Sequence, residues 1–158
     1  MSKEVTAEQL QKLLTQKEMR KLQAICMNTH PEVIVDELAQ LDISDINQIF
    51  AELETRLQAT LLGHFPPELQ VELAESMDRY MLATIFTEMA PDERVDLLKS
   101  LSENRQNAVL FALAQTEREN IRKLASYEEG TAGSVMTSDY VTLSPELTAG
   151  EAIAKIRL

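Results

Sequence analysis

The chain has 158 residues, of which 44% are hydrophobic, and its formal net charge is −11. These values predict a folded protein of one domain, or of one domain and a fragment of another, and no apolar run approaches the ~20 residues that span a membrane. Residues 32–129 hold 20 acidic and eight basic side chains, a local balance of −12. Because such a surface repels the phosphate backbone, nucleic acid is a poor partner, and cations or basic surfaces are better candidates. The alternative is that the acids only line the solvated faces of short helices.

Ten short helices are expected before residue 127, because apolar residues recur three and four positions apart. The expected ranges are 7–14, 17–28, 31–40, 45–54, 56–63, 67–77, 79–89, 92–101, 103–114 and 117–126. A threonine followed three residues later by Glu or Gln fits a capping box at five helix starts, which are Thr6, Thr15, Thr29, Thr116 and Thr148. Ser44 is a sixth candidate cap, and Pro67 and Pro91 suit the first turn of a helix.

Four columns of apolar residues recur at an interval of 24 residues. They are Leu38, Leu62, Phe86 and Leu110; Leu41, Phe65, Met89 and Leu113; Ile49, Leu73, Leu97 and Ile121; and Leu53, Met77, Leu101 and Ala125. A unit of two short helices cannot bury its apolar face alone, so successive units must stack. The predicted fold class is therefore all-α, a superhelical array of about ten short helices built from 24-residue helical hairpins.

The sequence excludes several kinds of chemistry. Cys26 is the only cysteine, so no internal disulfide and no cysteine-rich metal site can form, and a packing role is expected. The chain has no pairing of nucleophile and base, no glycine-rich phosphate loop and no metal cluster, so we expect no enzymatic activity. The N-terminus has no apolar signal core, and a cytosolic location is expected.

The composition changes after Tyr127, where three of the four glycines lie. The stretch 140–143 is β-prone and precedes Ser144 and Pro145, so it predicts one short strand. A helix with a capping box is expected from Thr148 to Arg157. Because a lone strand needs a partner, this tail is expected to begin a second domain.

The tail also carries a family resemblance. Residues 127–153 read YEEGTAGSVMTSDYVTLSPELTAGEAI. The Tyr-Glu-Glu and Thr-Ala-Gly elements, the Val-Met-Thr that follows and the Thr-x-x-Glu-Ala helix resemble the start of the first CBS domain of the MgtE family of magnesium transporters. The array resembles that family's intracellular N domain from about residue 30 onward. The resemblance thus implies an N domain at 1–128 and an incomplete first CBS domain at 129–158.

The resemblance implies a regulatory role at the cytoplasmic face of the cell membrane. In that family a cytosolic N domain and a CBS pair precede a membrane pore, and the implied partners are the CBS and membrane domains of the same transporter, as a homodimer. Mg²⁺ held between the N domain and the CBS domains would stabilise a docked state and so gate the pore. Mg²⁺ would then bind this chain weakly, because half of each site is missing.

Three acids are predicted as Mg²⁺ ligands. Asp92 and Glu93 follow Pro91 in the first turn of a predicted helix, and Asp96 lies one turn further on the same face. Mg²⁺ keeps several waters and takes one or two carboxylates, so it needs no fixed ligand spacing. By resemblance, Asp92 matches an N-domain acid at the interface with the CBS domains. The alternative is that the helix dipole alone favours acids in a first turn.

A second metal-contacting acid of the family falls near Thr60, which is not a carboxylate. Either that site is lost or Glu72 or Glu75 takes its place. His64 lies nearby, and a capping or surface role is expected for it. The competing function is a helical-repeat scaffold for protein interactions with no metal role, since such arrays commonly present a concave surface to a partner.

Overall fold

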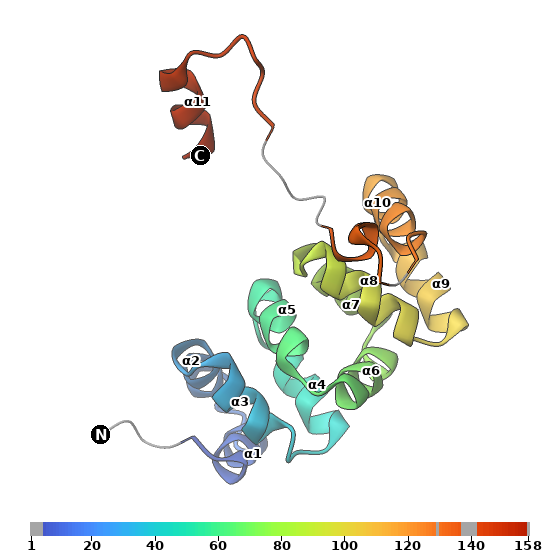
Figure 1. Ribbon diagram of the computed structural model, residues 1–158. Coiled ribbons are helices and arrows are strands. Elements are labelled where there is room, and N and C mark those ends of the chain that lie inside the picture. Colours follow the sequence, from blue (N-terminus) through green and yellow to red (C-terminus); the bar gives the residue numbers. More distant parts are fainter. Residues whose placement is uncertain (1–4, 129, 137–141, 158) are drawn as a thin grey trace.

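The computed structural model describes residues 5–128, 130–136 and 142–157, and within them it is helical with no strand (Figure 1). The described helices are α1 Ala7–Thr15, α2 Met19–Asn28, α3 Pro31–Leu38, α4 Ile43–Ala51, α5 Thr55–His64, α6 Pro67–Ser76, α7 Arg79–Glu88, α8 Pro91–Ser100, α9 Glu103–Ala112, α10 Gln115–Ala125, the 3₁₀ helix η1 Ala132–Val135 and α11 Ala149–Ile156. The predicted all-α array of ten short helices is confirmed.

The ten helices of the array begin at a constant interval. Their first residues are 7, 19, 31, 43, 55, 67, 79, 91, 103 and 115, so each helix starts 12 residues after the previous one. From α3 onward each helix packs on the next but one, which gives a row of α3, α5, α7 and α9 and a row of α4, α6, α8 and α10 (Figure 1). The predicted 24-residue repeat is therefore one helix from each row.

The four apolar columns form the core between the rows. All their members are buried except Leu41, Leu110 and Ala125, which pack partly buried against the others. Phe50 and Phe86 are fully buried, and the ring centroids of Phe50 and Phe65 lie 6.1 Å apart. Cys26 is also buried, as predicted, and burial raises the pKa of its thiol to about 11.

Two of the predicted threonine caps are confirmed. The Thr6 hydroxyl accepts a hydrogen bond from the Gln9 amide at 3.3 Å, and Thr148 forms a full capping box with Glu151. The other predictions were wrong: Thr15 ends α1, Thr29 follows α2, and Ser44 and Thr116 lie inside α4 and α10. Those helices start at other residues, α2 at Met19, α3 at Pro31, α4 at Ile43 and α10 at Gln115.

The prolines behave as predicted, since Pro67 and Pro91 occupy the first turns of α6 and α8. Two caps were missed. The Ser102 hydroxyl accepts from the Arg105 amide, and the Asp78 carboxylate accepts from the amides of Met81 and Tyr80 at the start of α7. The hydrogen bonds from Met81 and Tyr80 hold the pKa of Asp78 below its ordinary value.

Polar side chains within the array satisfy the carbonyl groups at helix C-termini. Gln58 of α5 is 6% exposed, and its amide nitrogen donates to the carbonyl oxygens of Phe50 and Leu53 at the end of α4. One repeat later position 82 is a leucine, and Arg105 of α9 instead donates to the equivalent carbonyls of Ala74 and Met77.

The same fourth position of the helix is used again in later units. Gln70, Arg94, Gln106 and Arg118 each donate to a carbonyl at the end of the helix before their own. A long donor at this position therefore stabilises the turn between consecutive helices, because an unpaired buried carbonyl is costly.

Gln58→Leu is expected to lower the free energy of unfolding by about 1–3 kcal/mol, because leucine fits a position that is leucine one repeat later but leaves two carbonyls without their donor. Urea denaturation would measure the change. Gln48→Leu is the matched control, since Gln48 is exposed and donates only to the Ser44 carbonyl of its own helix at 3.4 Å. Equal losses in the two variants would contradict this role for Gln58.

The chain after α10 begins with a short ordered stretch. Tyr127 packs partly buried against the core, and η1 contacts α10. The predicted strand lies partly outside the described residues, which omit Tyr140 and Val141, and Thr142 and Leu143 are not in a strand. None of the described helices has the length and apolar character required to cross a membrane.

Candidate functional site

The three predicted ligands all lie on α8, but their carboxylates do not converge on one site. Asp92 is half-buried, whereas Glu93 and Asp96 are exposed. The helix follows Ala90, which has no side-chain acceptor for the first amides. Asp92 and Glu93 therefore lie where a negative charge stabilises the positive end of the helix dipole. The helix dipole alone therefore gives these two acids a structural role that does not require Mg²⁺.

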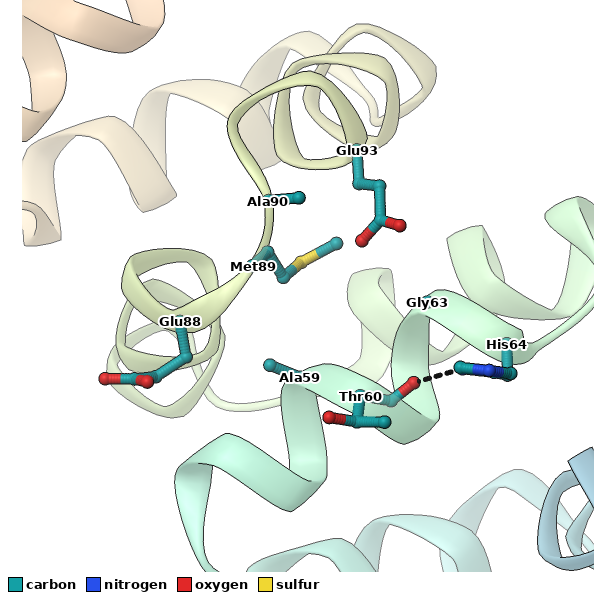
Figure 2. Close-up of a pocket in the computed structure, with 8 residues that line it drawn as sticks. All are labelled: Ala59, Thr60, Gly63, His64, Glu88, Met89, Ala90 and Glu93. Carbon is teal, nitrogen blue, oxygen red and sulfur yellow. Dashed lines mark hydrogen bonds between the residues drawn. The ribbon is translucent and has the colours of Figure 1, made fainter. Parts of the chain in front are cut away.

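Glu93 borders a hollow between α5 and the turn that joins α7 to α8. The hollow has a volume of about 360 Å³, and its lining residues are Ala59, Thr60, Gly63, His64, Glu88, Met89, Ala90 and Glu93 (Figure 2). The Glu93 carboxylate lies close over Gly63, where an added Cβ would be 3.3 Å from its Oε2 atom. Figure 2 shows the Glu88 carboxylate pointing away from Glu93, so the two carboxylates do not converge.

Asp96 borders a different hollow. That space measures about 370 Å³ and lies between α8 and the stretch after α10, with Lys99, Gly130, Ser134 and Val135 also in its wall. Glu93 and Asp96 therefore open onto separate spaces. Within the residues that the structure describes, no group of three or more His, Cys, Asp or Glu side chains is arranged to hold a metal ion.

The donor set still fits Mg²⁺ in kind. Carboxylate oxygens are hard ligands, and Mg²⁺ needs only one or two of them because it keeps several waters. The predicted acids of α8 are on or near the surface, and no ion pair is found for them in the described part of the chain. One or two of these carboxylates would therefore suffice as the protein ligands of Mg²⁺.

Thr60 lines the same hollow as Glu93, but its side chain points away from the Glu93 carboxylate (Figure 2). Glu75 does not take its place, because its carboxylate accepts hydrogen bonds from the Ser102 amide at 2.6 Å and the Ser102 hydroxyl at 3.1 Å. Glu72 does not line the hollow either. His64 is exposed, and its Nδ1 donates to the Thr60 carbonyl at 2.7 Å, which agrees with the predicted capping or surface role.

Sequence reasoning missed Gly63. Its absent side chain makes room for the Glu93 carboxylate across the gap between α5 and α8. A signal was available, because glycine near the end of a helical pattern disfavours the helix and so often has a packing reason. The 24-residue repeat also makes Glu117 the equivalent of Glu93. Glu117 forms an ion pair with Arg94, whereas no ion pair of Glu93 is found among the described residues.

Comparison with known families decides the relationship. Residues 29–130 match the family model of the MgtE intracellular N domain, which is well over half of the chain. This chain belongs to the MgtE family. The matched family is defined by an intracellular domain and not by an enzymatic activity. The match ends at residue 130, just after the last helix of the array. A search of curated protein sequences found no match.

Two solved structures share the MgtE fold seen here. The "soluble part of a magnesium transporter" has a TM-score of 0.83 at 22% identity, and the alignment covers 96% of this chain and 60% of that one. The "cytosolic domain of the Mg2+ channel MgtE in complex with ATP" has a TM-score of 0.82 at 26% identity, with 96% and 62% covered. The chain thus spans about 60% of the length of each of these structures.

Proposed function

We propose that this MgtE chain is the Mg²⁺-sensing part of a magnesium transporter and works at the cytoplasmic face of the membrane. The helical array docks on CBS domains of the same transporter when Mg²⁺ lies between them, and this docking gates the pore. The observation that carries the proposal is the family match together with the acids of α8, which lie on an array whose central 98 residues have a balance of −12.

The physical basis is electrostatic. An array with this charge is repelled by another acidic surface, and a divalent cation between the two removes part of the repulsion. The ion shifts the equilibrium only as far as it binds the docked state more tightly than the undocked one. Surface carboxylates with no ion pair in the described part of the chain meet this requirement, because they would gain a full ligand set only when the second surface arrives.

Small-angle scattering on the longer protein with its complete CBS pair tests the proposal. Mg²⁺ is expected to reduce the radius of gyration with a defined midpoint, whereas K⁺ at equal ionic strength should not. Unchanged dimensions in Mg²⁺ would contradict the sensor and favour the alternative, a scaffold that binds proteins through its concave surface.

Asp92→Asn in the full transporter is expected to preserve the fold and to raise the Mg²⁺ concentration at the midpoint of docking several-fold, because the amide keeps the shape but loses the charge. Protection from protease of the segment between the array and the CBS domains, measured against Mg²⁺, reports the midpoint. Asp36→Asn is the charge-matched control on α3, where Asp36 is exposed. Equal midpoints in wild type and Asp92→Asn would leave Asp92 as a dipole-favoured surface acid.

A further inference from the structure

The motif that begins at Tyr127 has a structural role that its family resemblance does not explain. We propose that Tyr127 and Gly133 form a clasp, which makes η1 part of the helical array and fixes where the chain leaves it. The clasp is a conformational device that joins the array to whatever follows it. Its link to Mg²⁺ sensing rests on the proposed function, but the clasp itself does not.

The contact between the two residues leaves no room for a side chain at position 133. A Cβ added to Gly133 would lie 2.4 Å from Cδ1, 2.5 Å from Cγ and 2.9 Å from Cε1 of the Tyr127 ring. The ring is partly buried against the core, so moving it aside would cost some of that packing. Only glycine therefore allows the backbone of η1 to approach the ring this closely.

Glu128, Gly130, Thr131 and Ser134 give the chain near the ring its turned shape. Gly130 has φ +80°, a left-handed conformation that favours glycine. The Thr131 amide and hydroxyl both donate to the Glu128 carbonyl, at 3.2 and 2.7 Å. The Ser134 amide and hydroxyl both donate to the Thr131 carbonyl, at 3.1 and 2.8 Å. These two turns bring the backbone of Gly133 against the ring of Tyr127.

The clasp also forms one wall of the hollow that Asp96 borders. Ser134 and Val135 face Asp96, Lys99 and Ser100 of α8 across this space. Release of η1 would therefore change the surroundings of a predicted ligand as well as the exit of the chain. With the clasp closed, a movement of the array is passed on to the chain at Met136; with it open, the two are uncoupled.

Hydrogen exchange tests the clasp in the full chain. Gly133→Ala is expected to speed exchange of the Ser134 amide by at least about 10-fold, because η1 must leave the ring. Tyr127→Ala should do the same by removing the other half of the contact. The matched control is Gly150→Ala, since a Cβ at Gly150 has nothing within 4 Å. Far-UV circular dichroism verifies that each variant keeps its helices. Ser134 exchange unchanged in both clasp variants would overturn the proposal.

A double variant separates the contact from the backbone freedom of glycine. In a Tyr127→Ala background, Gly133→Ala should add less than about twofold, because the ring that excludes the new methyl group is gone. An equal acceleration in both backgrounds would show that Gly133 matters only for its own backbone and would refute the clasp.

The transporter itself tests the coupling. Gly133→Ala is expected to broaden or shift the Mg²⁺ midpoint of docking, and Gly150→Ala is not. If Mg²⁺ fails to compact even the wild-type protein, the proposed function falls while the exchange result still decides the clasp. If the clasp opens in Gly133→Ala but the Mg²⁺ midpoint is unchanged, the coupling is refuted, and the clasp only covers the end of the array.

Discussion

Replacing Phe86 with alanine is expected to lower the free energy of unfolding by about 3–5 kcal/mol, the usual cost of removing a fully buried aromatic side chain. Phe86 has no exposed surface and lies in α7, in the middle of its row. The cavity would separate α7 from the units on both sides, and stacked repeats depend on such neighbour contacts for stability. A fall of roughly 10 °C or more in the melting temperature should follow.

Phe111→Ala provides the matched control for this experiment. Phe111 is 77% exposed on α9, the last helix of the same row. Its replacement removes the same atoms but opens no cavity, so a change within about 0.5 kcal/mol is expected. Thermal and urea denaturation of the two variants would measure the difference. Similar losses of unfolding free energy in the two variants would show that burial of Phe86 does not stabilise the row.

Glu117→Ala is expected to cost about 2–3 kcal/mol, the second largest effect. Arg94 of α8 donates to the Glu117 carboxylate of α10 at 2.9 Å, and the two side chains are 4% and 33% exposed. Without Glu117 the buried guanidinium keeps only a long hydrogen bond of 3.4 Å to the Phe86 carbonyl. A buried charge without its partner is strongly destabilising, and the partial exposure of Glu117 keeps the cost below the upper end of the usual range.

Two further variants show whether the unpaired charge is the cause. Arg94→Met combined with Glu117→Ala should recover part of the loss, because no charge is then left buried. Glu119→Ala on the same helix should change stability by less than about 0.5 kcal/mol, since Glu119 is exposed and bonds only to Gln115 of its own helix. A double variant less stable than Glu117→Ala would contradict the argument.

The repeating part of the fold could be predicted from the sequence, because apolar columns survive in any stacked arrangement. Leu62 and Phe86 are 24 residues apart and both are fully buried. Helix starts were harder, since only some are set by a local cap such as Thr6. At Thr116 the local pattern favoured a cap, but stacking starts α10 earlier, at Gln115. The donor pairs were not predictable either, because Arg105 reaches carbonyls 28 and 31 residues away.

The candidate site was predictable only as a location on one helix. Pro91 and the acids after it indicated the first turn of α8, and the structure places them there. The two hollows could not be foreseen, because each needs a second wall from a distant segment. Gly63 supplies one wall and Ser134 the other, and neither lies near α8 in the sequence.

The constant spacing of helix starts restricts how such an array can change in length. Because consecutive helices alternate between the two rows, adding or deleting one 12-residue helix would move every later helix into the opposite row. The contacts from each fourth position to the preceding helix would survive, but Arg105 of α9 would no longer meet the carbonyls of Ala74 and Met77 beyond two intervening helices. A gain or loss of 24 residues preserves the alternation between rows and changes only the number of helix pairs. Natural or engineered variation in the length of this domain should therefore occur in steps of two helices. Variants that gain or lose an odd number of helices are expected to fold poorly.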